Sequence, residues 1–513
     1  MTGAGASTGR SGGATLGARL RAWGPAALLA LVAVALHIDV VDRVAAEDQS
    51  SEALLQEAHA LIGRRWIGGA DRTDLTRRAI AGMTTALDPY SRFYTPEQAR
   101  IFNEETQGKF GGLGIFIDLT EDGIVSVIAP LAGTPAADAG ILPGDRFVLI
   151  DGEARRFGAT NEAVDALKGD PGTTIRLTVE SGTGAEASRR EVTLTRSIIR
   201  VESVRGTRIV DEDAGIGFLR ITAFQGDTFE EVVQALLTLK KAGARAVVID
   251  LRMNPGGLLD TATDIADLFL DKERLIVTTR TVDRTIEKTR ASRECAVPGM
   301  PIAVLIDGGS ASAAEVLAGA LRDQGKAVLV GSRSFGKGSV QSLITLLDGQ
   351  SMLKLTTAWY YTPSGRRIHR PEKAKLEDEW GLLPDFVVEL SREEQLRLAE
   401  RQSERYIASL KRRSREGRDG SDDSSGAKPP PDKMPEDKTP AEKTPADKTP
   451  EDGATDAPET PVKTDLELDR GLGTAVRHLR EVLDGRAALI PGGGAGAMKP
   501  ADGSKRASTG SDK

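Results

Sequence analysis

A regular alternation of apolar, strand-like runs with helix-like segments begins after residue 201 and restricts the fold more than any other feature. Runs such as AVVIDL (246–251) and IAVLID (302–307) are apolar at nearly every position. Strands that are apolar on both faces require a layer of helices on each side of their sheet. The alternation therefore predicts an α/β domain with a covered sheet. Its expected helices span 228–242, 258–269 and 311–321.

The segment before this domain, residues 108–198, has a different pattern. Short β-rich runs such as LGIFIDL and TIRLTVE alternate with Gly and Pro turns, and one helical patch lies at 161–167. A series of short strands with turn residues between them predicts a compact β-rich domain. Further upstream, apolar residues recur at helical spacing between residues 51 and 102, so we expect a small helical region over 47–107.

The N-terminal 46 residues have the layout of a targeting segment. Arg10, Arg19 and Arg21 precede an apolar run over 22–38, as in a secretory signal or a single membrane anchor. The most apolar part is short for a bilayer crossing, which favours a cleaved signal, whereas a buried helix of a soluble domain is the alternative. We therefore expect export to a periplasmic or other extracytoplasmic part of the cell envelope. Attachment to the inner membrane through this segment stays open.

The C-terminal part of the chain alternates between helical and unstructured patterns. We expect a charged helix over 393–415 and a second helix over 464–487. Between them, residues 416–463 repeat Lys-Thr-Pro with acidic neighbours, a composition that cannot form a core and predicts a disordered linker. The Gly-, Ala- and Lys-rich tail over 488–513 is expected to be disordered as well.

Composition excludes several classes of protein. The net charge is −7 and the pI is near 5.5, so no global basic field favours binding to nucleic acid. Cys295 is the single cysteine, which rules out an intramolecular disulfide and a zinc ribbon. The four histidines lie far apart, and none belongs to a metal-spaced pair. We expect no metal and no organic cofactor.

The stretch GSRSFGKGSVQ (331–341) resembles a phosphate-binding loop at first sight. That loop requires Ser or Thr after its lysine, because the hydroxyl ligates Mg²⁺, and Gly338 stands there instead. The residues that follow have the β-branched character of a strand, whereas a phosphate loop opens a helix. Ser334 and Lys337 also fit S-x-x-K of penicillin-binding enzymes, but the companion motifs are missing. Both alternatives are weak.

Ser312 is placed where a nucleophile would be useful. A Gly-rich turn after an apolar strand puts this serine at the start of an expected helix, where unpaired N–H groups and the helix dipole favour developing negative charge. The next backbone N–H can help to stabilise an oxyanion. A base is still needed, and no histidine lies between His59 and His369.

Here a resemblance becomes specific. The segment is similar to the C-terminal processing, or tail-specific, peptidases, whose nucleophile is the middle serine of G-S-A-S-A-S-E and whose base is the lysine of F-G-K-G. GSASAAE assigns the nucleophile to Ser312, and FGKG assigns the base to Lys337 with the family's spacing. Gln341 matches the glutamine that orients the lysine. Ala314 replaces the third serine, which has no catalytic role in that scheme.

A lysine base has a physical requirement. Its pKa must fall from about 10.4 towards 7 to 8, through burial or nearby positive charge, before it can accept a proton near neutral pH. Gly336 and Gly338 permit close packing around Lys337. The alternative for Lys337 considered alone is a solvated loop lysine.

The stretch DLRMNPGGLL (250–259) resembles the family's oxyanion turn. By this resemblance a glycine N–H, from Gly257 as first choice or Gly256 as second, forms the oxyanion hole together with the Ala313 N–H. A purely structural turn between strand and helix is the alternative.

The β-rich domain resembles a PDZ domain. FGGLGI (110–115) matches the loop whose N–H groups capture a peptide's terminal carboxylate before the peptide adds to a sheet edge. GTPAADAGILPGDRFVLIDG (133–152) matches the family pattern closely. Lys168 stands where the family has arginine, and a lysine cannot make arginine's bidentate hydrogen bonds. The expected peptide-binding residues are Gly111, Gly112, Leu113, Gly114 and Ile115.

The resemblance implies a fold and an activity. The fold is an α/β catalytic domain (199–392) with crotonase/ClpP-like character, preceded by a β-rich PDZ domain and a small helical N-terminal region. The activity is that of an exported serine endopeptidase that binds substrate C-termini through its PDZ domain and cleaves by Ser-Lys acyl transfer. A catalytically silent PDZ scaffold is the alternative. The substrate, an activating adaptor and the oligomeric state stay open.

Overall fold

The computed structural model describes residues 51–182, 187–283, 286–375, 377–419 and 462–490. The predicted targeting segment and most of the predicted linker and tail lie outside these residues. The described residues divide into two compact units, the first ending at Thr95 and the second beginning at Pro96. The first unit contains a helix over 51–65, α2 (Arg72–Thr85) and the short strand β1 (Arg92–Tyr94). Asp71 caps α2 by accepting hydrogen bonds from two backbone N–H groups.

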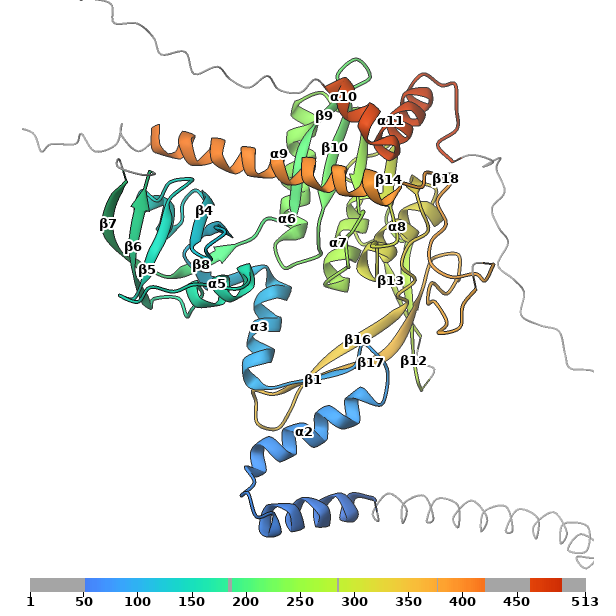
Figure 1. Cartoon of the computed structure of the whole chain (residues 1–513). Coiled ribbons are helices and arrows are strands. Elements are labelled where there is room, and N and C mark those ends of the chain that lie inside the picture. Colours follow the sequence, from blue (N-terminus) through green and yellow to red (C-terminus); the bar gives the residue numbers. More distant parts are fainter. Residues whose placement is uncertain (1–50, 183–186, 284–285, 376, 420–461, 491–513) are drawn as a thin grey trace, which may run out of the picture. The chain divides into compact units, whose positions relative to one another are not determined.

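The core of the second unit is a sheet of six strands in the order β18-β15-β14-β11-β10-β9. All neighbouring pairs are parallel except β9 with β10. Figure 1 shows this sheet together with the helices around it. The strands span Val204–Asp211 (β9), Ile216–Ile221 (β10), Ala246–Asp250 (β11), Ile302–Ile306 (β14), Ala327–Gly331 (β15) and Phe386–Val387 (β18).

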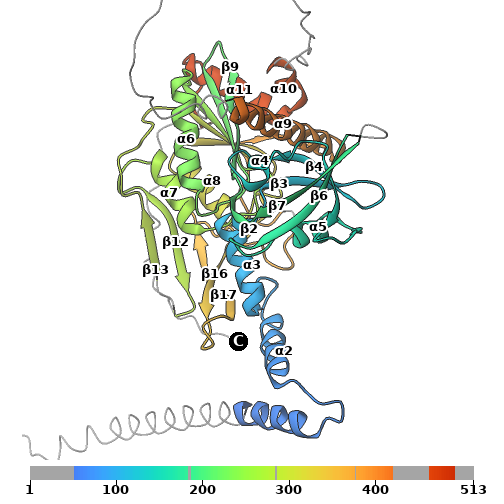
Figure 2. The same ribbon diagram turned by 90° about the vertical axis from the view of Figure 1, so that its left-hand side faces the viewer.

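Helices cover both faces of this sheet, as the apolar runs predict. One face packs against α6 (Thr228–Lys241), α7 (Leu259–Phe269) and α8 (Ala313–Asp323), and the other against α11 (Arg470–Leu483). Successive residues of β11 alternate between the two cores: Val247 points to the first and Val248 to the second. Figure 2 shows the same helices from a second direction.

After the loop that contains Lys337, the chain enters a second sheet. It contains β16 (Ser339–Thr345), β17 (Met352–Tyr361), β12 (Leu275–Thr281) and β13 (Ile286–Arg290), all antiparallel to their neighbours. Because a strand rather than a helix follows Gly338, the chain does not form a phosphate-binding loop there. The expectation of a strand after Lys337 is confirmed.

The β-rich domain is an antiparallel sheet in the order β3-β4-β5-β6-β7 with its own apolar core. Its elements are β3 (Ile115–Leu119), β4 (Val125–Pro130), α4 (Pro135–Asp138), β5 (Arg146–Ile150), α5 (Thr160–Leu167), β6 (Thr174–Ser181) and β7 (Ser188–Thr195). A two-stranded ribbon of β2 (Lys109–Gly112) and β8 (Ser197–Arg200) carries the chain into and out of the domain. Strand β3 lies at the edge of the sheet, so its outer side can accept another strand.

Two predicted helical segments differ from the structure. The N-terminal helical region contains the strand β1, and its last helix, α3 (Pro96–Gln107), belongs to the second unit. The single helix predicted over 464–487 is two helices, α10 (Val462–Leu468) and α11. Asp469 interrupts it because this residue leaves the helical conformation (φ −104°, ψ 88°) and its side chain caps α11. The charged helix, α9, spans Arg392–Asp419.

Candidate active site

Three neighbouring parallel strands present the predicted site residues at their carboxyl ends. Strand β11 leads into the turn that contains Gly256 and Gly257, β14 leads to Ser312, and β15 leads into the loop that contains Lys337. Loops at the carboxyl ends of adjacent parallel strands meet at one edge of the sheet, which is where α/β proteins place their sites. Residues that are far apart in sequence therefore reach the same region.

Ser312 lies at the N-terminus of α8 in a strained backbone conformation. Its φ of 56° and ψ of −118° are unusual for a residue with a side chain, and such strain persists only where the surroundings enforce it. The Ser312 side chain is partly exposed, whereas Ala311 and Ala313 are buried on either side of it. The serine is thus presented to solvent from a rigid support.

The Gly256–Gly257 turn lies directly beside Ser312. A Cβ added to Gly256 would come within 2.8 Å of the Ser312 Cβ and 3.0 Å of the Ala313 nitrogen. Gly256 and Gly257 both have positive φ, at 101° and 142°, and a Cβ on Gly257 would clash with the Phe224 carbonyl at 2.0 Å. Only glycine fits at either position.

The two glycines differ in the availability of their N–H groups. The buried Gly256 N–H donates to the Asn254 side-chain oxygen at 2.8 Å, whereas Gly257 is exposed and its N–H has no hydrogen-bond partner among the described residues. The Ala313 N–H is likewise unused within the described part of the chain. This arrangement supports the N–H groups of Gly257 and Ala313 as the donors of the predicted oxyanion hole. The Gly256 N–H is already bonded to Asn254 and lies beside them.

A buried carboxylate, Glu315, connects the Ser312 and Lys337 segments. Its Oε2 accepts hydrogen bonds from the backbone nitrogens of Ser312 (2.9 Å) and Lys337 (2.8 Å). Its Oε1 accepts from the Ser334 hydroxyl (2.5 Å) and the Gly336 nitrogen (2.8 Å). One oxygen atom therefore holds the backbones of the proposed nucleophile and base side by side.

Glu315 is fully buried, and burial raises its pKa although the four hydrogen bonds favour the ionised form. Sequence reasoning gave this residue no role, although it closes the GSASAAE motif. A carboxylate at the third position of a helix whose N-terminus holds a serine is a recognisable signal, because it can reach back to the backbone N–H of the first residue.

The Lys337 loop is packed closely on both sides. A Cβ on Gly336 would meet Arg370 and Trp380 at 2.9 Å, and a Cβ on Gly338 would meet the His369 backbone at 2.6 Å. The Tyr360 hydroxyl donates to the Lys337 carbonyl. Lys337 is half-buried, so the alternative of a freely solvated loop lysine is not supported.

Gln341 lies on β16, four residues after Lys337. Its amide nitrogen donates to the Ser339 hydroxyl at 2.9 Å and to the Thr356 hydroxyl at 3.4 Å. These contacts fix the side chain at the start of the strand. Its role in orienting Lys337 stays a prediction.

The predicted carboxylate loop of the β-rich domain is held by its own backbone contacts. The Leu113 carbonyl accepts a hydrogen bond from a backbone N–H at the start of α4, and the Gly114 carbonyl accepts one from the turn before that helix. Gly114 has a φ of 75°, and a Cβ there would clash with Thr134. Gly111 and Gly112 belong to β2, and Ile115 begins the edge strand β3. Helix α5 packs against β3, as expected for a peptide groove between them.

Lys168 contacts the residue that precedes this loop. Its ammonium group lies 4.9 Å from the centre of the Phe110 ring, and the next residue, Gly169, donates its N–H to the Gly111 carbonyl at 3.2 Å. A lysine can make this cation–π contact without the bidentate hydrogen bonding of arginine. Its place is therefore beside the strand that enters the predicted peptide-binding loop.

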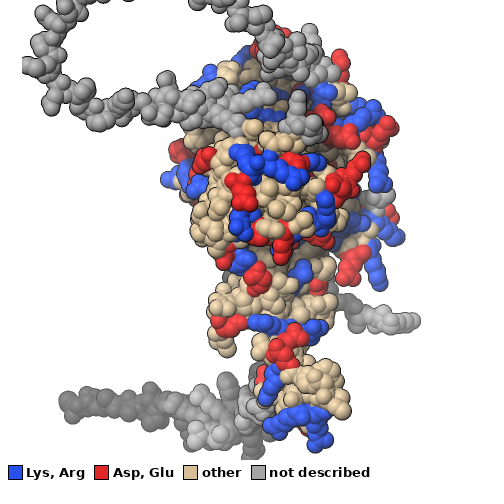
Figure 3. Space-filling model, turned by 60° about the vertical axis from the view of Figure 1, so that its left-hand side comes forward, with Lys and Arg blue, Asp and Glu red and all other residues tan. Residues whose placement is uncertain are grey.

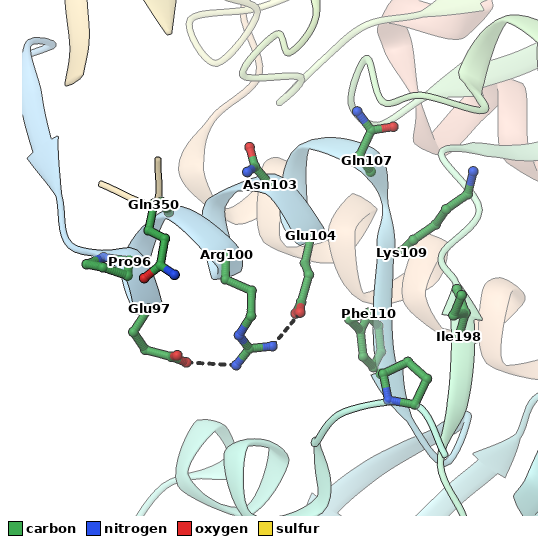
Figure 4. A pocket seen from close by; sticks show the side chains of 13 residues that line it. Pro96, Glu97, Arg100, Asn103, Glu104, Gln107, Lys109, Phe110, Ile198 and Gln350 are labelled. Carbon is green, nitrogen blue, oxygen red and sulfur yellow. Dashed lines mark hydrogen bonds and ion pairs between the residues drawn. The ribbon is translucent and has the colours of Figure 1, made fainter. Parts of the chain in front are cut away.

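A pocket of about 710 Å³ lies between α3, β2 and the β16–β17 turn. Figure 4 shows Arg100 inside it, paired with Glu97 and Glu104 of the same helix. Gly111 is the only predicted site residue in its lining, and neither Ser312 nor Lys337 contributes to it. The pocket is therefore separate from the proposed catalytic centre.

The described residues contain no group of three or more His, Cys, Asp or Glu side chains that could hold a metal ion. In the described ranges, no helix is sufficiently long and apolar to cross a membrane.

Figure 3 shows basic and acidic side chains interspersed over the face in view, with no extended patch of one sign.

Comparison with known proteins agrees with this architecture. Residues 215–388 match the model of peptidase family S41, and residues 126–181 match that of the PDZ domain. A carboxy-terminal-processing protease of Bartonella bacilliformis is 39% identical over 323 residues, which cover 62% of this chain and 70% of the relative. A probable CtpA-like serine protease of Staphylococcus aureus (strain COL) is 33% identical over 372 residues, or 71% and 70% of the two chains.

Among solved structures, the photosystem II D1 C-terminal processing protease is 27% identical, with a TM-score of 0.39, and the match covers 66% of this chain and 93% of that one. The curated relatives and the two domain matches define the class as serine peptidases that carry a PDZ domain. The chain belongs to the carboxy-terminal-processing proteases of peptidase family S41.

Replacing Glu315 tests the connection between the two segments. In Glu315→Gln one oxygen becomes an NH₂ group, so whichever way the amide turns, one pair of donors loses its acceptor. We expect a loss of about 1–3 kcal/mol in the free energy of unfolding and a fall of roughly tenfold or more in kcat/KM. Urea unfolding and peptidase assays measure both.

The matched control is Glu230→Gln, the same chemical change at an exposed position in the first turn of α6. It should change stability by no more than about 0.5 kcal/mol. Wild-type stability and activity in Glu315→Gln would contradict the role of this carboxylate.

Proposed function

We propose that this protein is an exported endopeptidase in which Ser312 is the nucleophile and Lys337 the general base. The observation that carries the proposal is the shared Glu315 oxygen, which joins the Ser312 and Lys337 backbones. The strained serine at a helix start and the open N–H groups of Gly257 and Ala313 support the same assignment. A silent scaffold would need a lost nucleophile, base or oxyanion glycine, and this chain retains all three.

The chemistry is acyl transfer in two stages. Neutral Lys337 accepts the Ser312 hydroxyl proton while Ser312 Oγ bonds to the scissile carbonyl carbon, and the carbonyl oxygen becomes an oxyanion near Gly257 and Ala313. The lysine then gives its proton to the leaving amine, so the C–N bond breaks and an acyl-enzyme remains. Water, deprotonated by the same lysine, hydrolyses the ester and restores Ser312. Gln341 orients Lys337 in this scheme.

The PDZ domain supplies substrate recognition. Peptides bound by this protease would add a strand to the exposed edge of β3 and place their terminal carboxylate at the loop from Gly111 to Ile115. Its substrates are therefore proteins or peptides with free C-termini. The charge layout of the first 46 residues supports export to the cell envelope, with the N-terminal segment as the means of membrane attachment if it is not removed.

The first test removes the proposed nucleophile and base one at a time. Ser312→Ala and Lys337→Ala should each lower kcat for an unfolded protein substrate by roughly 10⁴-fold or more, because the two groups act as one unit. Both variants should keep wild-type circular dichroism and PDZ-peptide affinity. Turnover at the wild-type rate by either folded variant would overturn the dyad. Gln341→Ala should show a smaller fall in kcat.

The second test concerns the PDZ loop. A peptide with an apolar free C-terminus should bind to Ser312→Ala protein at least about tenfold more tightly than the same peptide amidated at its C-terminus, because the loop N–H groups would lose a charged acceptor. Fluorescence anisotropy measures both affinities. Equal affinities would contradict the proposal that the loop binds a terminal carboxylate, and they would not bear on the proposed Ser312–Lys337 dyad.

A further inference from the structure

The C-terminal segment contacts the oxyanion turn directly through Asp469. Both oxygens of this carboxylate accept hydrogen bonds from the Arg252 guanidinium, at 2.8 and 2.7 Å. The same guanidinium donates to both oxygens of Asp250, at 2.9 and 2.8 Å. Arg252 therefore lies between two carboxylates, and its planar guanidinium donates two hydrogen bonds to each of them.

All three side chains are removed from water. The exposed fractions are 0% for Asp250, 6% for Arg252 and 5% for Asp469. Charges buried to this extent carry a large desolvation cost, which is offset only when hydrogen bonding is nearly complete. Loss of one carboxylate would leave part of the guanidinium buried without a partner, so Arg252 would shift or admit water.

The charges of this cluster stabilise one another. Burial alone would favour neutral Asp250, but the adjacent Arg252 and, more weakly, Arg220 hold the pKa of that carboxyl below its ordinary value. Burial likewise disfavours the charge on Arg252, and the two carboxylates outweigh it and raise its pKa well above the ordinary value. The charged forms of Asp250 and Arg252 therefore favour each other inside the buried cluster.

Arg252 is the first residue of the turn that ends in the oxyanion glycines. The next residue, Met253, has a φ of 57°, a strained conformation for a residue with a side chain. The Asn254 side chain then donates to the Ile221 carbonyl and accepts from the Gly256 N–H, both at 2.8 Å. A displacement of Arg252 would release the strained residue and move the glycines beside Ser312.

Asp469 has a fixed position of its own. It is the N-cap of α11, and its Oδ1 also accepts the Leu472 N–H at 3.0 Å. Leu472, Ala475 and Leu479 are buried in the second core of the sheet, so packing determines where the cap lies. The helix thus holds its capping carboxylate against Arg252 as a rigid support.

We propose that Asp469 is a positioning residue of the peptidase: through Arg252 it fixes the turn that carries the Gly257 N–H, which makes the C-terminal segment from α10 to α11 part of the catalytic unit. This inference rests on the proposed function. It also gives a physical reason for the break between the two helices, since a continuous helix would lack the capping geometry at residue 469.

Asp469→Asn in the full chain tests the inference, because Asn is an equally good N-cap but lacks the charge and one of the two acceptors. We expect kcat to fall at least about tenfold, while KM stays within about twofold and PDZ-peptide affinity is unchanged, since transition-state stabilisation alone is weakened. Assays are made well below the unfolding midpoint. Asp469→Ser also keeps a favoured N-cap and is assayed for the same changes in kcat and KM. If the Asp469→Asn variant does not fold, the result for Asp469→Ser tests the positioning role in its place.

The matched control is Asp211→Asn. Asp211 is buried (7% exposed) and pairs with Arg480 in the last turn of the same helix, at 2.6–2.7 Å. The control should lose stability but keep kcat within about twofold of the wild type. Wild-type kcat in folded Asp469→Asn, or an equal fall in both variants, would overturn the positioning role. Activity in Ser312→Ala would instead refute the proposed dyad, so the two failures can be distinguished.

Discussion

The arrangement of the candidate active site depends on one fully buried carboxylate, that of Glu315. Glu315 accepts hydrogen bonds from Ser312, Ser334, Gly336 and Lys337, and all four donors lie on two loops that follow neighbouring strands. A buried acid of this kind is costly unless its oxygens are fully bonded, so the two loops are stable only in the arrangement that satisfies it. The relative position of the proposed nucleophile and base thus follows from the need to hydrogen-bond Glu315.

The turn after β11 is the third component, and it is fixed in a similar way from the opposite side of the sheet. Asn254 connects this turn to the segment before Ser312, because its carbonyl accepts the Ala311 N–H at 2.9 Å. Arg252 connects it to α11. Two buried polar clusters, one around Glu315 and one around Arg252, therefore hold the strained backbone at Ser312 and Met253.

Much of this could be predicted from sequence because the relevant signals are local. Apolar runs such as AVVIDL indicate burial on both faces, and glycines such as Gly257 indicate backbone that no side chain permits. The roles of Glu315 and Asp469 could not be predicted by periodicity. A charged residue in an amphipathic helix normally faces solvent, and the partner of Asp469 lies 217 residues away. The division of the C-terminal helix at Asp469 follows from that distant contact.

The central claim is that Ser312 attacks with Lys337 as its base, and covalent labelling tests it most directly. The rate at which a fluorophosphonate modifies the protein should be followed against pH, with the labelled residue identified by mass spectrometry. We predict that Ser312 alone is labelled, that the rate rises with pH as the base loses its proton, and that Lys337→Ala is labelled at least about 100-fold more slowly. Labelling of a different residue, or an unchanged rate in folded Lys337→Ala, would contradict the account.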